Sequence, residues 1–127
     1  MSRLSDSIYQ SHDIPEEQVE VPEWGVTILL RGLDGESRAR YLERYMTPDA
    51  NGDLHIDYAV MYPAILVETC FDPEDGSLVF DKGEEDIARI NKKAAQVIER
   101  LAQKASEMSG LTANEEKKAA QSFREDA

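Results

Sequence analysis

The side chains best suited to chemistry are acidic and lie in two turn-like stretches. The first stretch places oxygen atoms at alternating positions, like the start of a calcium-binding EF-hand loop: Asp49, Asn51, Asp53 and Asp57. An EF-hand needs glycine at its sixth position and a bidentate glutamate at its twelfth. Counted from Asp49, these positions hold Leu54 and Val60, and the stretch 72–76 fails the same test. We therefore interpret both stretches as acidic turns rather than metal sites.

Nucleophiles and metal-binding nitrogens are too few and too scattered to form a site. Cys70 is the one cysteine, so the chain can form neither an internal disulfide nor a cysteine metal cluster. We predict a small buried thiol there, since no histidine or basic residue adjoins it. His12 and His55 do not pair with a cysteine or a second histidine at the spacing of a zinc site. The sequence thus predicts no catalytic, cofactor-binding or metal site, and a protein that is not an enzyme.

The charge balance limits the class of partner. Lys and Arg total 14 against 26 Asp and Glu, which gives a formal net charge of −12. This charge opposes binding to nucleic acid or to an anionic membrane, so a basic partner, or one that must be kept soluble, fits better. The first residues lack the apolar run of a signal peptide, and the longest apolar stretch, 59–67, is too short to span a membrane. With a single cysteine, these features indicate a reducing cytoplasm.

The longest periodic segment runs from Phe80 to Gly110. Its apolar residues recur at steps of three and four and form one stripe of an amphipathic helix: Ile87, Ile90, Ala94, Val97, Leu101, Ala105 and Met108. Ile98 and Ala102 widen that stripe. We favour Asn91 as a second N-cap, which splits the segment into a short helix and a long one over Lys92–Ser109. The alternative is one continuous helix with Asn91 inside it.

Two further helices are predicted before this segment. Asp34 is a suitable N-cap for a helix from about Gly35 to Met46, in which apolar residues follow helical spacing. The segment Ile56–Phe71 is apolar nearly all round, which is typical of a buried helix, and Pro63 must kink or interrupt it. The short run Ser77–Phe80 is expected to be extended and to close one end of the core.

A β-hairpin is predicted ahead of these helices. Apolar residues alternate over 26–30, and 19–21 offers a short partner strand across the turn Pro22–Gly25. Such a ribbon is stable only when a helix covers it. Trp24 is expected to be a packing lid over the hairpin rather than a ligand-stacking platform, because no second aromatic or charged group stands at a spacing that would complete a site.

These elements predict a mainly α fold: a small helical domain with a short N-terminal β-hairpin packed on the helices and mobile arms at both ends. We place a polar, disordered or loosely attached arm at 1–18, a single domain at 19–111 and a polar C-terminal helix or tail at 112–127. Phe123 is an isolated aromatic in that tail, and it either clips onto the body or anchors another protein.

The order of these elements resembles the tail assembly chaperones of long-tailed bacteriophages. The resemblance covers roughly 19–111 and rests on four stretches: the hairpin VPEWGVTILLRGLDGESRARYLE, the buried AILVETCFDPEDGSLVF, the helix entry EEDIARINKK and the helix end QVIERLAQKASEMSGL. Each stretch is a pattern of apolar and turn residues, so the specificity comes from their order and spacing.

The resemblance implies a non-enzymatic, mostly helical protein of the host bacterium's cytoplasm. Family members are thought to coat the aggregation-prone tape measure protein, recruit tail tube subunits and leave before the tail is complete. The implied partners are the tape measure protein and the tail tube protein, without nucleic acid, membrane or cofactor, and a homo-oligomer is left open. Many such genes also yield a longer product by programmed frameshifting, which would extend this chain's tail from Thr112.

A chaperone for a long helical client needs a free apolar surface, and we place it on the spare width of the longest helix. The predicted protein-binding residues are Val97, Ile98, Leu101, Ala102, Ala105 and Phe123. The alternative is that the whole stripe belongs to the core. A second function class is an acidic phage-encoded inhibitor or adaptor that binds a host protein, although the acids here alternate with lysine and arginine instead of forming stripes.

Overall fold

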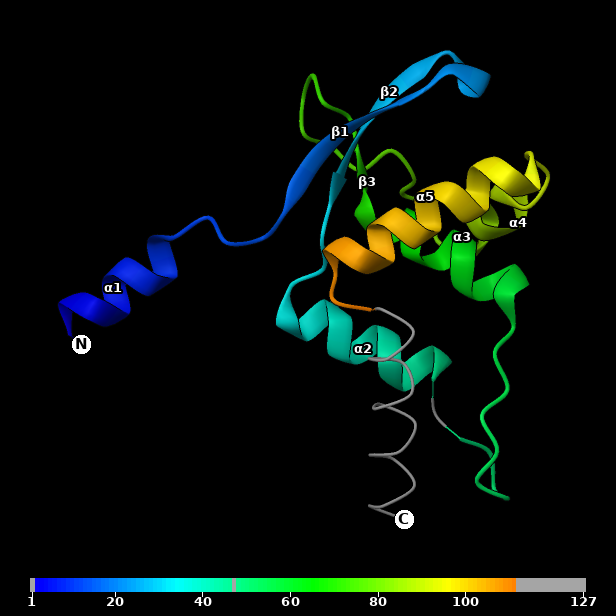
Figure 1. Cartoon of the computed structure of the whole chain (residues 1–127), viewed down its shortest axis with the longest axis horizontal. Helices are drawn as coiled ribbons and strands as arrows, with labels where there is room; N and C mark the ends of the chain where they lie inside the picture. The colour runs from blue at the N-terminus through cyan, green and yellow to red at the C-terminus, as the bar shows by residue number, and fades with distance from the viewer. Residues whose placement is uncertain (1, 47, 112–127) are drawn as a thin grey trace.

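A computed structural model describes residues 2–46 and 48–111. In this part of the chain, helices pack against a small antiparallel sheet, and one further helix stands apart at the N-terminal end (Figure 1). The elements follow one another in the order α1 Arg3–Gln10, β1 Glu16–Val21, the 3₁₀ turn η1 Pro22–Trp24, β2 Val26–Arg31, α2 Gly35–Tyr45, α3 Tyr58–Thr69, β3 Cys70–Phe71, α4 Glu84–Ile90 and α5 Ala95–Met108.

The predicted hairpin is confirmed. β1 and β2 pair in antiparallel register, and Gly25 follows η1 in the left-handed conformation (φ 65°) that lets the chain turn into β2. β1 begins earlier than the predicted Val19, because the ladder continues to Glu16 opposite Arg31. The side chains of Glu16 and Arg31 also form an ion pair at 2.9 Å. The pairing therefore reaches into the segment that we predicted to be a free arm.

A third strand changes the fold class from the predicted mainly α to mixed α/β. We predicted helix through Phe71, but α3 ends at Thr69 and Cys70 is extended (φ −92°, ψ 122°). Cys70 and Phe71 pair with Leu30 and Leu29 of β2. A buried backbone needs hydrogen-bond partners, and the open edge of β2 supplies them. The sheet has the order β1-β2-β3 and joins the hairpin directly to the buried helix.

The helices agree well with the prediction. Asp34 is the N-cap of α2, and its carboxylate accepts a hydrogen bond from the Ser37 amide at 2.8 Å. α3 continues through Pro63. The break between α4 and α5 is confirmed, but Asn91 is the C-cap of α4 and not the N-cap of the long helix. Its side-chain amide instead donates to the Ala59 carbonyl, which ties the corner between α4 and α5 to α3.

The core lies between α3, α5 and the inner face of the sheet. Its largest fully buried side chains come from all three, with Ile65 and Leu66 on α3, Leu101 on α5 and Leu30 on β2. Met46, just after α2, closes the core from the side of that helix. None of the described helices combines the length and the apolar character of a membrane span.

The N-terminal arm contains a helix, whereas we predicted a polar segment without a sustained period. The Ser2 hydroxyl caps α1 by accepting a hydrogen bond from the Ser5 amide at 3.1 Å. Leu4 and Ile8 lie one turn apart on one face of the helix. Two apolar residues in so short a segment are too few to reveal a helical period in the sequence. None of the eight residues of α1 is buried. The helix stands well away from the sheet and the other helices (Figure 1).

Candidate partner-binding groove

The apolar stripe that we predicted to bind a partner is buried. Five of its residues are between 0 and 6% exposed: Val97, Ile98, Leu101, Ala102 and Ala105. They belong to the core, where α5 packs against both α3 and β2. Because α3 and β2 together cover this stripe, its five residues leave no exposed apolar surface for a partner on α5. Phe123, the sixth predicted residue, lies outside the described residues.

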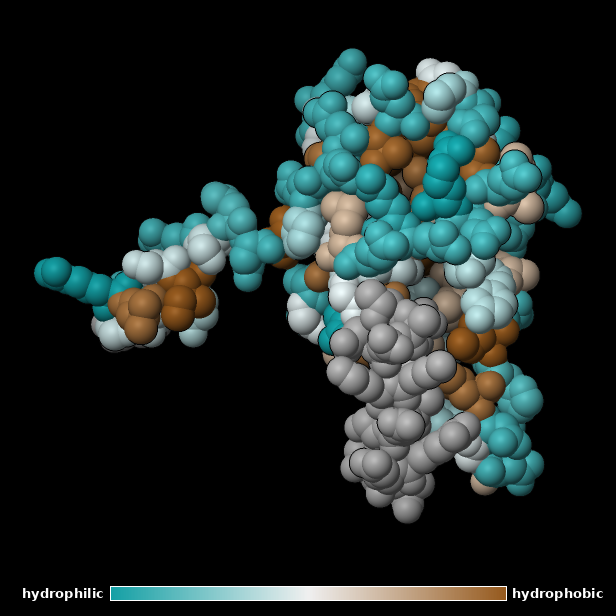
Figure 2. Space-filling model, in the orientation of Figure 1, coloured by the Kyte–Doolittle hydropathy of each residue, from teal (hydrophilic) through white to brown (hydrophobic). Residues whose placement is uncertain are grey.

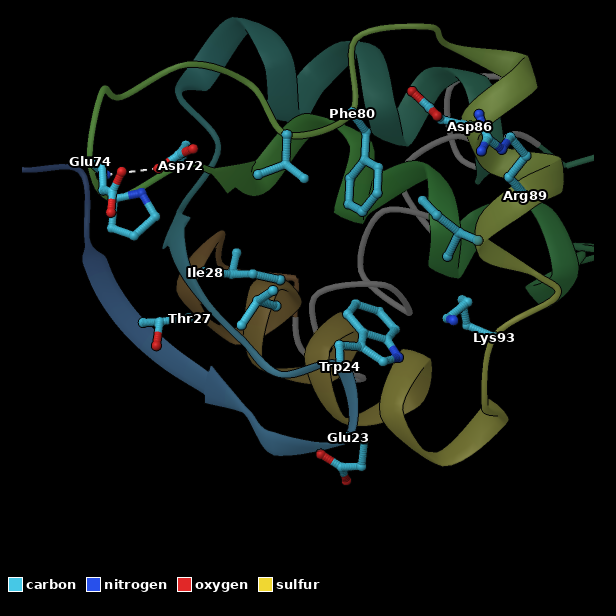
Figure 3. Close-up of a pocket in the computed structure, with 14 residues that line it drawn as sticks. Glu23, Trp24, Thr27, Ile28, Asp72, Glu74, Phe80, Asp86, Arg89 and Lys93 are labelled. Atoms are coloured by element: carbon cyan, nitrogen blue, oxygen red, sulfur yellow. Dashed lines mark hydrogen bonds between the residues drawn. The ribbon is translucent and has the colours of Figure 1, made fainter.

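Accessible apolar surface is found instead in a groove of about 1080 Å³. The hairpin tip forms one wall, the loop 72–80 forms a second and α4 forms a third (Figure 3). In Figure 3, Trp24 and Phe80 extend into the space between these segments from opposite sides, and Ile28 lies between them and the acidic end of the groove. The groove therefore brings together side chains that are far apart in the sequence.

The middle of the groove is apolar. Six apolar side chains line it: Trp24, Val26, Ile28, Val79, Phe80 and Ile90. Trp24 and Phe80 are half-buried and also pack against the core, so Trp24 has the packing role that we predicted. Val26 and Val79 are 48% and 42% exposed, which leaves apolar area for a partner to cover. Trp24 thus covers the core and lines a candidate binding surface at the same time.

The two ends of the groove carry opposite charges. Asp72 and Glu74 lie at one end, on the loop, and Arg89 and Lys93 lie at the other, on and just after α4 (Figure 3). The Asp86 carboxylate lies beside Arg89 and offsets part of the positive charge of that end, whereas the Glu23 carboxylate, which also lines the groove, is paired with Arg100. An apolar middle between an acidic and a basic end suits a short amphipathic segment in one orientation.

An ion pair holds the hairpin tip against α5. The Arg100 guanidinium donates to both carboxylate oxygens of Glu23, at 2.8 and 2.9 Å. These hydrogen bonds are the main reason why the pKa of Glu23 is lowered to about 2. Lys104, further along α5, pairs with Glu17 of β1. Cationic residues of α5 thus offset acidic residues of the hairpin and fix the wall of the groove that carries Trp24.

Backbone hydrogen bonds hold the opposite wall, the loop 72–80. The Asp72 carboxylate accepts a hydrogen bond from the Glu74 amide at 2.8 Å, and the Asp72 amide donates to the Ser77 carbonyl at 2.8 Å. The Val79 amide donates to the Cys70 carbonyl at 3.1 Å, so the loop returns to β3. The hairpin wall and the loop wall are therefore both fixed by contacts within the chain.

A cluster of side chains that could hold a metal ion lies outside this groove. Asp49, Asp53 and His55 come within 4.8 Å of one another on the exposed turn before α3. The Asp49 carboxylate accepts hydrogen bonds from the amides of Asn51 and Asp53 at 2.9 and 3.0 Å, and it pairs with His55 at 2.9 Å. Backbone hydrogen bonding, chiefly from Asp53, lowers the pKa of Asp49. These bonds are those of the acidic turn that we predicted.

The predicted burial of Cys70 is confirmed. Its side chain is 0% exposed, and burial raises the pKa of the thiol to about 12. A protonated, inaccessible thiol is a poor nucleophile and a poor metal ligand, so this residue acts as a small core side chain.

Comparison with known proteins gives the family. The sequence profile of the phage tail assembly chaperones matches residues 8–120. The chain belongs to this family. A solved structure of the bacteriophage HK97 tail assembly chaperone is similar, with a TM-score of 0.50 and 20% identity over 85% of this chain and 95% of that chain. At that identity the likeness concerns the fold alone. Comparison with curated sequences gives no match.

For this tail assembly chaperone, the sequence resemblance is confirmed, whereas the groove was missed. Trp24 and the run Ser77–Phe80 were each singled out, but nothing in their spacing indicates that they face one another. One feature of the sequence pointed to it: Val26 and Val79 lie in short elements that are too small to bury all of their apolar side chains, and both remain exposed. Only the pairing of β2 with β3 brings these two segments to one groove.

Proposed function

We propose that this tail assembly chaperone binds the tape measure protein of its phage, keeps it soluble in the host cytoplasm and helps to recruit tail tube subunits. It would leave before the tail is complete and be absent from the finished virion. The proposal rests on family membership together with one structural observation, the groove between the hairpin tip, the loop 72–80 and α4. The tape measure protein is called the client below.

The groove supports binding of a helical client segment. Helix-in-groove recognition places the apolar face of an amphipathic helix against a hydrophobic trough, and Trp24, Ile28 and Phe80 provide such a trough. The charged ends would favour one direction of the client helix, because its positive N-terminus suits Asp72 and its negative C-terminus suits Lys93. The formal net charge of −12 on the chain keeps the complex soluble by repulsion between copies.

Co-expression with the protein encoded immediately downstream tests the function. We expect that protein, if long and helical, to become soluble and to co-purify with this chain. A downstream protein that stays insoluble and never co-purifies would overturn the proposed function.

Substitutions in the groove test the site. Val79→Asp places a charge in the apolar trough without disturbing the core, because the side chain is 42% exposed. We expect it to weaken client binding by about tenfold or more, since the charge would be desolvated by the client. Tyr58→Asp is the matched control, because Tyr58 is an exposed apolar residue outside the groove, at 51%. Equal binding by both variants would place the client elsewhere.

Trp24 provides a direct optical signal. It is the single tryptophan of the chain, so intrinsic fluorescence reports on the groove alone. Titration with tryptophan-free synthetic peptides that tile the client should shift the emission to shorter wavelength, because the indole loses water contact. The same peptides should leave the emission of the Val79→Asp variant unchanged at equal concentration.

A further inference from the structure

β1 is the end strand of the sheet, and one of its edges is open. In the order β1-β2-β3 it pairs with β2, and no described residue pairs with its other edge. The first three residues of β1 and Glu20 are exposed. The register with β2 is continuous from Glu16 to Val21, without a bulge or a proline. A regular, exposed edge of this kind can pair with a further strand.

Every second residue of β1 turns its backbone groups to the open edge. The Pro15 carbonyl accepts a hydrogen bond from the Gly32 amide at 2.9 Å, so these two residues form a hydrogen-bonded pair. Such pairs alternate along an antiparallel ladder, so the odd-numbered residues of β1 bond to β2. The even-numbered residues turn their amide and carbonyl groups outward: Glu16, Gln18 and Glu20. No backbone hydrogen bond among the described residues uses these outward groups.

The side chains of the same three residues make this edge acidic. The odd-numbered side chains face α5, where Glu17 pairs with Lys104, so the even-numbered ones lie together on the outer face of the sheet. Glu16 pairs with Arg31 at 2.9 Å, whereas Glu20 has no ion pair with a described residue. The surface is mainly hydrophilic in Figure 2 where β1 runs in Figure 1.

These charges limit the kind of strand that can pair. In antiparallel pairing of two copies about Gln18, Glu16 of each copy would lie opposite Glu20 of the other. Like charges directly opposite each other destabilise a sheet, so the open edge discriminates against its own copies. A strand with cationic residues four positions apart would instead place one of them opposite each glutamate, on one face. The formal net charge of −12 also attracts a cationic strand during encounter.

The open edge is separate from the groove. No residue of β1 lines the groove, and β2 lies between the two surfaces (Figure 3). The ladder to β2 and the pair between Glu17 and Lys104 fix β1 within the chain, so a partner does not have to order it. A partner on the edge and a client in the groove can therefore be bound together.

We propose that β1 binds an extended segment of a second protein by strand addition, antiparallel to β1, with cationic residues opposite Glu16 and Glu20. Main-chain hydrogen bonds to the three outward residues supply affinity, and the two glutamates select the sequence. The partner segment carries lysine or arginine four positions apart among β-branched residues. This binding does not depend on the role of the groove.

A synthetic peptide with the core Lys-Thr-Val-Thr-Lys tests strand addition. Amide hydrogen exchange, followed by NMR, should be slowed by about tenfold or more at Glu16, Gln18 and Glu20 when the peptide is bound. The odd-numbered amides of β1 are the internal control, because they already bond to β2. No slowing at the three outward amides with millimolar peptide overturns the proposal. Slowing without peptide that grows with chain concentration would assign the edge to a second copy and overturn it as well.

Backbone methylation of the peptide separates strand addition from simple charge attraction. An N-methyl group on the central valine blocks the amide that faces Gln18 and should weaken binding by about tenfold or more. The same group on the following threonine points away from β1, so that peptide should bind as the unmodified one does. Equal binding by the two methylated peptides overturns the paired geometry.

Charge exchange tests the direction of the added strand. Glu20→Lys should weaken binding of the two-lysine peptide by about three- to tenfold. A peptide with glutamate in place of its first lysine should bind this variant better than one with glutamate in place of its last; the reverse order overturns antiparallel pairing. Asp53→Lys is the matched control, because it changes the net charge equally on the turn before α3, away from the sheet (Figure 1). Equal weakening by both variants would reduce the effect to net charge and overturn the site.

Client binding separates this edge from the groove. Glu20→Lys should leave co-purification with the client unchanged, since no residue of β1 lines the groove. Peptide binding by a chain that fails to bind the client would overturn the proposed function alone. Loss of client binding in Glu20→Lys, with the fold intact by circular dichroism, would overturn the separation of the two surfaces.

Discussion

Two amphipathic helices of this chain, α5 and α1, differ in the burial of their apolar faces. The apolar face of α5 is covered by α3 and β2, and Leu101 in its middle is 1% exposed. The apolar face of α1 is open, with Leu4 at 70%. The two helices have the same kind of pattern, so the pattern shows that a face must be covered and does not show what covers it.

The difference comes from how each helix is connected. α5 follows α4 through a corner that Asn91 ties to α3, and Arg100 and Lys104 pair with Glu23 and Glu17 of the hairpin. α1 is joined to the sheet only by a short segment that ends at Pro15. We expected partner binding on α5. In the structure, the exposed apolar surface lies on α1 and in the groove instead.

Shortening a buried side chain of α5 should give the largest loss of stability. Leu101→Ala removes a fully buried side chain between α3 and the sheet and should lower the free energy of unfolding by about 2–5 kcal/mol. Urea unfolding followed by circular dichroism measures this loss. Gln103→Ala, on the exposed side of the same helix, should change it by less than about 0.5 kcal/mol. Similar values for both would show that the stripe of α5 is not core.

The junction between the hairpin and the end of α5 should be the next most sensitive. A methyl group at Gly32 would lie 2.5 Å from the Met108 carbonyl oxygen, so the backbone must move. Gly32→Ala should lower the free energy of unfolding by about 1–3 kcal/mol. Gly35→Ala is the control, since nothing lies within 4 Å of its added methyl. Equal stability of the two variants would contradict close contact at this junction.

The ion pair at the hairpin tip should give a smaller effect that depends on pH. The folded pKa of Glu23 is about 2, below its ordinary 4.5, because Arg100 donates to its carboxylate. Its stabilisation is therefore fully present above pH 4.5 and is lost as the pH falls toward 2. Melting temperatures of the natural chain and of Glu23→Gln should differ above pH 4.5 and converge as the pH falls. A difference that stays constant down to pH 2 would rule out this pair as its source.

Shortening an apolar side chain of α1 should give the smallest loss of stability. Ile8→Ala removes an apolar side chain that is 58% exposed, so the free energy of unfolding should change by less than about 0.5 kcal/mol when the chain is monomeric. Urea unfolding at high dilution makes the measurement, with Leu101→Ala as the counterpart on α5. A loss above about 1 kcal/mol would show that α1 packs on its own body and would remove the contrast between the two helices.

The sequence by itself determined the local elements and the family. Asp34 as N-cap, the turn at Gly25 and the break near Asn91 depend on neighbours within a few residues, and each is confirmed. The family resemblance also comes from the order of such local patterns, and it is confirmed over residues 8–120.

Tertiary structure decided the fold class and the place of the free apolar surface. β3 forms because the edge of β2 is within reach of Cys70, a contact between segments that the sequence does not relate. The same contact brings Trp24 and Phe80 to one groove and leaves α1 outside. Burial is roughly proportional to the apolar area that neighbours cover, and neighbours are fixed only when the whole chain has folded.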